Sequence, residues 1–316
     1  MNKSFVYICL LILATFFVVN LIARDDFPVL KGPYIGQKPP GQKPSIFMPG
    51  LLNTKEKGAF CTVFSPDLKE FYCVSYQRDV EDSGFICQMK MVNNLWTKPV
   101  TSSFSKYGLD NDMTMSSDGN RMIFRSWRAL PNGNKPKNHS YLWITERKKD
   151  GCSEAKPFLC GGAPVRTGYP SIALNDNVYF TFRGDEGLGI YRTKPVKGRY
   201  STPEFVTKVF SSEIIHGDMF IAPDESYMIV SCRDEEEKLG NGLLDLYILF
   251  KKADGSWTNP LNMGKEINTG AGENCPQLSP DGKYFFFNRY DPETKTGNMY
   301  WMNSGIIKQL HLNSLN

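Results

Sequence analysis

Apolar and aromatic residues flank a short polar phrase at five places along the chain. The phrase reads FSPDLKEFY at residues 64–72 and LSPDGKYFFF at residues 278–287. The other copies are MSSDGN at 115–120, IAPDES at 221–226 and a degraded IALNDN at 172–177. The flanking residues favour extended, half-buried backbone, whereas Pro, Asp and Gly together favour a tight turn. Each copy therefore predicts a β-hairpin.

Four aspartates mark the turns of the clear copies. They are Asp67, Asp118, Asp224 and Asp281. An Asp side chain at such a position hydrogen-bonds the local backbone, so we interpret these residues as structural parts of the turns. Steps of roughly 50–57 residues between copies are typical of repeat proteins, and of propeller blades in particular.

Two further elements follow the hairpins. A third strand is predicted at residues 85–89, 141–144, 189–192, 245–248 and 298–301. A fourth is predicted at residues 96–99, 152–155, 200–203 and 257–260, and most of its copies end in Pro. Pro within a strand is typical of an outer sheet edge, where the missing amide interrupts no ladder. One unit is therefore four antiparallel strands, which is the blade of a propeller.

The predicted fold is all-β: a β-propeller of four-stranded blades, with five blades or, as the alternative, six. The units run at about 58–107, 108–164, 165–213, 214–270 and 271–316. Residues 25–57, rich in Pro, Gly and Lys, precede them and are expected to run extended. The apolar end of this extension, at residues 45–52, could clasp the ring by adding a strand to the last blade, or could be the remnant of a sixth.

The repeats resemble the TolB-like propellers of bacterial envelopes, which are built from WD-like repeats with a Pro-Asp turn. The resemblance covers residues 58–316 and rests on SPDGK followed by aromatics, on third strands of the DLY type and on GSWTNP at 255–260. Residues 31–41 and 299–310 also look like parts of single-domain members. The third unit departs from the pattern because its turn lacks Pro, and Cys152 stands where a rim aromatic is expected. The resemblance implies the fold, whereas propellers host many unrelated activities.

The first 24 residues predict export. Lys3 precedes an apolar stretch at 5–19 that continues to Ala23 and ends at Arg24. A basic residue followed by an apolar core is typical of a secretory signal, and the full stretch is also long enough to span a bilayer. We therefore expect a cleaved signal peptide or an uncleaved membrane anchor, and either would place the propeller in the periplasm or cell envelope.

Charge and motifs exclude several classes of function. The formal net charge is only +4, and the basic residues are interspersed with acidic ones, so no nucleic-acid partner is predicted. The sequence contains no Gly-x-Ser-x-Gly elbow, His-Glu-x-x-His pair, phosphate loop or dinucleotide fingerprint. No cofactor is therefore expected.

The sequence contains eight cysteines, but their positions support few predictions. Four of them, in strand positions that are apolar in other units, are interpreted as small buried hydrophobes. These are Cys61, Cys73, Cys87 and Cys232. Thr62 should face Cys73 across the first hairpin, which puts Cys61 on the opposite face of that strand. Cys152 and Cys160 flank a short loop and form the pair to test for a disulfide. Cys-x-x-Cys spacing does not occur, so no metal site is predicted.

The segments that lead into the innermost strands carry the candidate site. In a propeller these strands line a central channel, and the loops before them crowd one of its mouths. Asp112, Asp218 and Cys275 each lie six residues before the turn aspartate of their unit, so they should occupy one level of the channel. The candidate ligand-binding residues around this level are Asp110, Asp112, Tyr169, His216, Asp218, Glu273 and Asn274. The alternative is that these polar residues only hydrate the channel mouth.

The expected function is that of a binding or protein-interaction module for an envelope protein, peptide or glycan. A membrane contact is expected only through a retained N-terminal segment, and no catalytic residue is assigned. The alternative is a carbohydrate-active enzyme, because paired carboxylates are the minimal machinery of a glycosidase. Asp112, Asp218 and Glu273 would then be the candidates for base, modulator and acid.

Overall fold

In the computed structural model the chain divides into two compact units, Met1–Leu30 and Lys31–Asn316. The structure describes residues 27–77, 80, 84–106, 110–134, 139–148, 151–166, 168–209, 215–233, 243–291, 293 and 296–314, with backbone only at 215 and 216. The predicted signal peptide or anchor at residues 1–24 lies outside the described residues. None of the helices in the described part of the chain has both the length and the apolar character of a membrane span.

Strands dominate the second unit, and five of its sheets each begin at an innermost strand. The first sheet contains β2 (Lys57–Phe64), β3 (Glu70–Gln77), β4 (Phe85–Val92), β5 (Leu95–Trp96) and β6 (Val100–Thr101). The second contains β7 (Asp110–Met115), β8 (Arg121–Ser126), β9 (Tyr141–Lys148), β10 (Gly151–Cys152) and β11 (Lys156–Pro157). The third contains β14 (Gly168–Ile172), β15 (Val178–Gly184), β16 (Gly187–Thr193) and β19 (Glu204–Thr207).

Two more sheets continue the series. The fourth contains β20 (Ile215–Ile221), β21 (Tyr227–Arg233), β22 (Asp245–Phe250) and β23 (Leu261–Asn262). The fifth contains β24 (Gly272–Leu278), β25 (Tyr284–Asp291), β26 (Thr296–Asn303) and β1 (Ser45–Ile46). The predicted third strands are therefore β4, β9, β16, β22 and β26, and the predicted hairpin turns join the first and second strands of each sheet.

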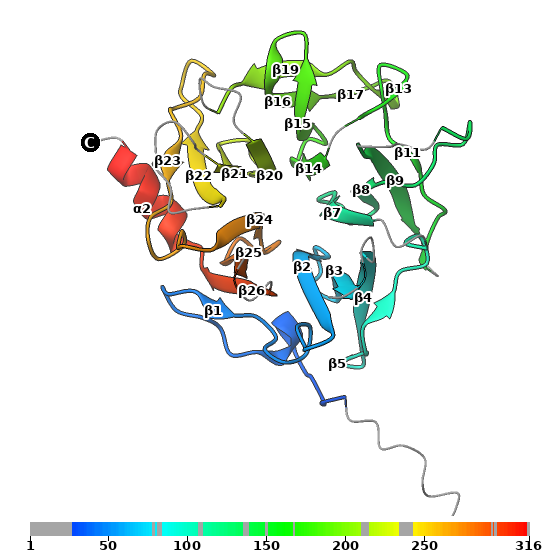
Figure 1. The fold of residues 1–316 in the computed structure, drawn as a ribbon, viewed down its shortest axis with the longest axis vertical. Helices are drawn as coiled ribbons and strands as arrows, with labels where there is room; N and C mark the ends of the chain where they lie inside the picture. The colour runs from blue at the N-terminus through cyan, green and yellow to red at the C-terminus, as the bar shows by residue number, and fades with distance from the viewer. Residues whose placement is uncertain are drawn as a thin grey trace, which may run out of the picture. The chain divides into compact units, whose positions relative to one another are not determined.

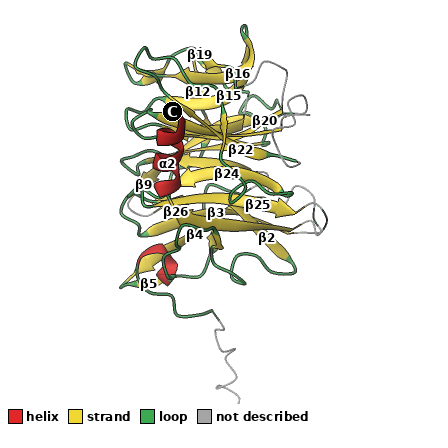
Figure 2. Ribbon diagram, turned by 90° about the vertical axis from the view of Figure 1, so that its left-hand side faces the viewer, coloured by secondary structure: helices red, strands yellow, loops and turns green. Residues whose placement is uncertain are grey.

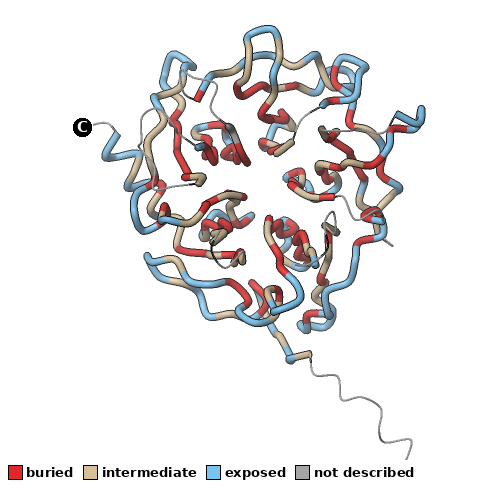
Figure 3. The backbone as a smooth tube through the Cα atoms, viewed as in Figure 1, coloured by how far each residue is buried: buried red, intermediate tan, exposed pale blue. Residues whose placement is uncertain are grey.

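The innermost strands form a closed ring around the central axis of this unit (Figure 1). Strand β2 contacts β7, β7 contacts β14, β14 contacts β20, β20 contacts β24, and β24 contacts β2 again. Buried residues concentrate on the strands, and exposed residues on the outer loops (Figure 3). This arrangement is the predicted all-β propeller of sheets with four strand positions. In the first two sheets the outer position is divided between two short strands, β5 and β6 on β4 and β10 and β11 on β9.

The number of sheets differs from the five that were expected. Within the described residues the strands form six sheets, so five was wrong and the alternative of six matches the sheet count. The sixth consists of β13 (Ala163–Pro164), β12 (Leu159–Cys160), β18 (Arg199–Tyr200) and β17 (Pro195–Val196). Each of these strands has two residues, and Figure 1 shows β13 and β17 at the periphery. The sixth sheet exists because outer segments of two neighbouring sheets pair with each other, through Cys160 and Tyr200.

Residues 45–47, near the end of the Pro-rich extension, lie between the first and last sheets of the ring. Strand β1 pairs with β26, with Ser45 opposite Trp301. Phe47 follows directly and is fully buried. Its ring centroid lies 5.1 Å from that of Trp301, 5.2 Å from Phe286 and 6.1 Å from Phe64. The extension therefore adds both an outer strand and an aromatic side chain where the two ends of the ring meet.

Two helical elements complete the unit. The 3-10 turn η1 (Pro33–Gly36) precedes β1, and the α-helix α2 (Gly305–Ser314) follows β26. Helix α2 lies on the outside of the sheets (Figure 2). It buries Ile307 in a cluster with Phe250, Phe285 and Met302. The C-terminal segment is therefore held by apolar packing.

Replacing Tyr34 with Phe is expected to reduce stability more at pH 7 than at pH 2. The Tyr34 hydroxyl donates a hydrogen bond of 2.5 Å to Asp281 Oδ1. Partial burial would raise the pKa of Asp281, but hydrogen bonds from Tyr34, Lys283 and Ser279 outweigh it and lower that pKa to about 2. A carboxyl whose pKa is depressed in the folded state stabilises above its unfolded pKa of about 4, and this contribution is lost as pH falls through about 2.

Urea unfolding at pH 7 should show a loss of about 1 kcal/mol for Tyr34→Phe, which is the scale of one partly exposed, charge-assisted hydrogen bond. The loss should be smaller at pH 2. Tyr284→Phe is the matched control, because the Tyr284 ring also packs on Tyr34. An equal loss at both pH values would contradict the assignment.

Candidate functional site

Each innermost strand carries a β-bulge at the same level of the channel. The ladder shifts register between Phe60 and Thr62 in β2, and equivalent shifts occur in β7, β14, β20 and β24. Four bulge residues adopt left-handed backbone, with φ of 48° at Cys61, 45° at Asp112, 59° at Tyr169 and 51° at Cys275. Bulges re-aim side chains, and a non-glycine residue at positive φ is uncommon. The repeated strain marks this level as a candidate site.

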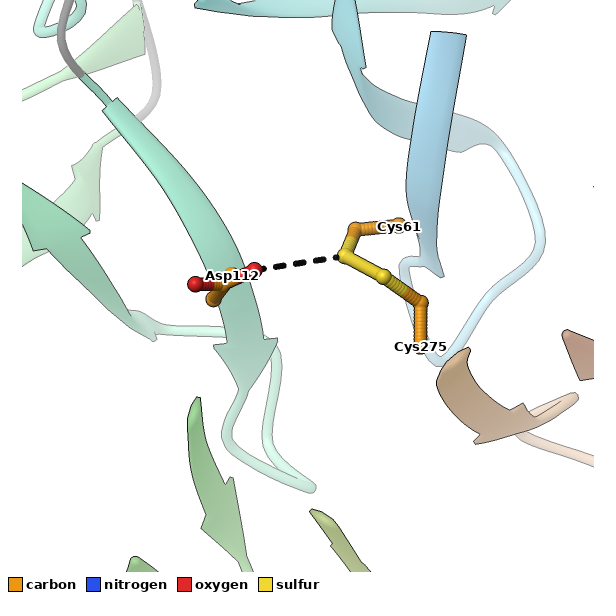
Figure 4. A group of neighbouring side chains, drawn as sticks. All are labelled: Cys61, Asp112 and Cys275. Carbon is orange, nitrogen blue, oxygen red and sulfur yellow. Dashed lines mark hydrogen bonds between the residues drawn. A yellow bond between two sulfur atoms is a disulfide. The ribbon is translucent and has the colours of Figure 1, made fainter. Parts of the chain in front are cut away.

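Cys61 and Cys275 are joined by a disulfide at this level (Figure 4). The interpretation of Cys61 as a buried hydrophobe was therefore wrong, and so was the candidate pair of Cys152 and Cys160, which are both free thiols. The bonded residues are 214 positions apart in the sequence, with Cα atoms 5.1 Å apart. They meet because ring closure brings β2 beside β24. Cys61 lies six residues before Asp67, so the offset that singled out Cys275 would also have found it.

Asp112 contacts both the disulfide and a buried arginine. Its Oδ1 lies 3.5 Å from Cys61 Sγ, and its Oδ2 accepts a 2.8 Å hydrogen bond from Arg125. Burial raises the pKa of Asp112, and the nearby Arg125 only partly offsets this. The Arg125 guanidinium also lies 4.8 Å from the Tyr169 ring centroid and 4.1 Å from that of Trp127. Arginine and aromatic rings thus hold the carboxylate in one orientation.

Asp218 is the second carboxyl at this level. Its Oδ2 accepts a 2.6 Å hydrogen bond from the backbone amide of Cys275. Burial, followed by repulsion from Asp112, raises the pKa of Asp218 to about 8. The pKa of this carboxyl thus lies far above the usual range of an aspartate, and its hydrogen bond to the Cys275 amide links β20 to β24.

Three other predicted site residues hold the starts of the inner strands. Asp110 accepts a 2.5 Å hydrogen bond from Arg128 and is fully buried. Glu273 is also fully buried and accepts 2.9 Å from Arg289 and 2.7 Å from Thr269. Asn274 accepts 2.9 Å from the Asn288 amide. The side chain of the remaining candidate, His216, lies outside the described residues.

The turn aspartates bind their own hairpins. Each accepts a hydrogen bond from a serine two residues away: Asp67 from Ser65 at 2.6 Å, Asp118 from Ser116 at 2.5 Å, Asp281 from Ser279 at 2.8 Å and Asp224 from Ser226 at 2.5 Å. Each also accepts a hydrogen bond of 2.9–3.2 Å from the backbone amide two residues further along the chain, which is the bond that defines an Asx-type turn. All four carboxylates therefore stabilise their own turns, and Asp281 also binds the distant Tyr34.

A cavity of about 270 Å³ lies at the opposite end of the innermost strands from the predicted channel mouth. All five inner strands contribute to it with their last residues and the turns that follow. The lining residues fall within 63–66, 114–117, 171–174, 220–223 and 277–280. Among the described residues that line the cavity, none carries an ionisable side chain. Reasoning from acidic residues missed this axial cavity, because its chemistry is apolar, hydroxyl and amide.

The comparisons with known proteins show the fold. No family model matches the sequence, nor does any curated protein sequence. Solved structures similar to this chain include a glycoside hydrolase, 12% identical with a TM-score of 0.55, covering 86% of this chain and 93% of the other. A putative TolB from Agrobacterium tumefaciens is 14% identical with a TM-score of 0.49, covering 78% and 76%. An auxiliary nutrient binding protein from Bacteroides thetaiotaomicron is 12% identical with a TM-score of 0.44, covering 77% and 56%. The protein is thus a β-propeller, and its activity must be argued from its own site.

Proposed function

We propose that this propeller is an exported binding module of the TolB-like kind, which takes a peptide segment of an envelope protein in its axial cavity. The observation that supports this function is the cavity lining, which all five inner strands build without any ionisable group. Apolar pockets with a few hydrogen-bonding groups are typical of ligand recognition. Such a lining offers hydroxyl and amide groups for hydrogen bonds but no carboxylate, histidine, lysine or cysteine as a general acid or base.

The exposed Leu174 supports an apolar ligand group. This side chain is 64% exposed and lies beside the cavity, together with Pro66, Pro223 and Pro280 from other turns. Burying such a leucine against a partner would contribute about 1.5–3 kcal/mol. An apolar side chain of an extended peptide is therefore the favoured ligand group. Export is proposed on the basis of the apolar stretch at 5–19.

Leu174→Glu is expected to weaken peptide binding about 10- to 100-fold, the affinity equivalent of one buried leucine contact. Binding partners would be found by thermal shift against short apolar peptides, oligosaccharides and peptidoglycan fragments, since a ligand of the folded state raises the melting temperature. Leu159→Glu is the matched control, because Leu159 is also exposed, at 46%, but lies on β12 outside the cavity. Equal binding by both variants would contradict the cavity as the site.

A glycosidase remains the second candidate because of the two channel carboxyls. Asp112 has an arginine partner, whereas the pKa of Asp218 is raised to about 8 by burial and by Asp112. Unequal environments of this kind separate acid and base roles in carboxylate pairs. Turnover of an oligosaccharide by the parent, lost in Asp218→Asn, would favour the enzyme. Binding without turnover would favour the module.

A further inference from the structure

We propose that Cys61, Cys275 and Asp112 form a Zn²⁺ site when the disulfide between the two cysteines is reduced. The site lies at the bulge level of the channel and is distinct from the axial cavity. The zinc proposal can therefore be tested independently of the proposed peptide binding.

The three ligand atoms converge from three different strands. The two sulfur atoms and a carboxylate oxygen all lie within 4.8 Å of one another, and all three residues are buried. Figure 4 shows the Asp112 carboxylate facing the sulfur pair. Tetrahedral zinc with Zn–S near 2.3 Å and Zn–O near 2.1 Å requires ligand atoms about 3.5–3.8 Å apart. The 3.5 Å between Asp112 Oδ1 and Cys61 Sγ already meets this requirement. The sulfur atoms would reach it by side-chain rotation once their bond is broken.

Arg125 orients the carboxylate as an outer-shell residue would. It donates to Asp112 Oδ2 at 2.8 Å, which leaves Oδ1 directed at the sulfur atoms. The backbone on the other side is also held, because the Cys275 amide donates to Asp218. Ligating carboxylates are commonly fixed by hydrogen bonds of this kind, which lower the cost of organising the site.

The donor set selects the class of ion. Two thiolates and one monodentate carboxylate suit zinc, whereas Mg²⁺ and Ca²⁺ require oxygen ligands. A water molecule would complete four-coordination. Neither cysteine belongs to a Cys-x-x-Cys motif, so sequence spacing gives no sign of the site.

Formation of the site requires a reductant, which we take to be a dithiol. Reduction breaks the S–S bond and transfers two electrons and two protons to the sulfur atoms, while the dithiol becomes a disulfide. Zinc then binds the two sulfurs as thiolates and releases their protons to solvent. Oxidation and zinc binding are thus alternative ways to join β2 to β24.

The test uses the full chain in two redox states. One sample is reduced with dithiothreitol and desalted without oxygen, and the other is kept oxidised. Stoichiometric Zn²⁺ should raise the melting temperature of the reduced sample and leave that of the oxidised sample unchanged, because only a site in the folded state stabilises it. Co²⁺ in place of zinc should produce sulfur-to-metal charge-transfer absorption in the reduced sample alone. A reduced sample whose melting temperature zinc does not raise would overturn the proposal.

Variants separate this site from adventitious binding. Asp112→Asn keeps both thiols and should weaken zinc affinity by about 10- to 100-fold, the usual effect of perturbing ligand or outer-shell groups. Cys275→Ser should abolish the zinc-induced shift. Cys152→Ser is the matched control, since Cys152 is a free, half-buried thiol elsewhere, and it should behave as the parent. Zinc stabilisation that survives Cys275→Ser or disappears in Cys152→Ser would overturn the assignment.

Discussion

Loss of the Cys61–Cys275 disulfide is expected to lower the free energy of unfolding by about 4 kcal/mol in the absence of metal. The bond joins residues 214 positions apart, so it restricts the unfolded chain over most of its length. Chain-entropy arguments assign about 5.4 kcal/mol to a loop of this length, and measured values are commonly lower. Because the bond also links the first inner strand to the last, its loss should open the ring where β2 meets β24.

Urea unfolding of the Cys61→Ala/Cys275→Ala double variant would measure this effect, with a chelator present to exclude metal. Cys152→Ala controls for the loss of a cysteine that makes no disulfide. The double variant should show a much lower urea midpoint than the control. A midpoint equal to that of the parent would mean that the disulfide does not hold the ring closed.

Asp218→Asn is expected to make the protein more stable at pH 8 than the parent, by about 2 kcal/mol or more. Burial and Asp112 raise the pKa of Asp218 to about 8 in the folded state. The unfolded chain ionises this carboxyl near pH 4, whereas the folded chain keeps it protonated, so the parent loses stability as pH rises from about 4 to 8. An amide cannot ionise, and its oxygen can still accept the hydrogen bond from Cys275.

The measurement is urea unfolding at pH 4.5 and pH 8 for parent and variant. The stability gain of the variant should be large at pH 8 and small at pH 4.5. The contribution of Asp218 to stability thus falls as pH rises, whereas that of Asp281 increases as pH rises above about 2. Asp224→Asn, in the exposed turn of the same sheet, is the control and should change stability little. A variant that is less stable than the parent at both pH values would show that Asp218 acts as an ionised structural partner.

Local sequence signals predicted the repeated parts of the fold well. The Pro-Asp turns and their flanking apolar residues mark the hairpins, and Thr62 faces Cys73 as predicted. These features depend on residues close together in sequence, where turn chemistry and side-chain alternation decide the structure. The sixth sheet could not be predicted from local sequence. Its pairing of Cys160 with Tyr200 depends on two outer segments that meet only in the folded ring.

At the candidate site, the sequence predicted the positions of some residues but not their contacts. Counting six residues back from each turn aspartate located Asp112, Asp218 and Cys275 at the bulge level. It did not indicate that Glu273 and Asp110 would be paired with arginines. Arg289 lies on the neighbouring strand β25, and Arg128 lies two residues beyond the end of β8. It also did not indicate the axial cavity, because its apolar and hydroxyl lining resembles ordinary core and turn residues in sequence.

The repeated units with four strand positions follow from local sequence, because each turn and its two flanking strands lie within a short segment, such as residues 57–77 for β2 and β3. Which residues meet across the ring depends on how the ring closes. Closure brings β2 beside β24 and so joins Cys61 to Cys275, with Asp112 at 3.5 Å and Asp218 on the Cys275 amide. Such contacts span up to 214 residues, and no local pattern specifies them, because they follow from the number and packing of the units.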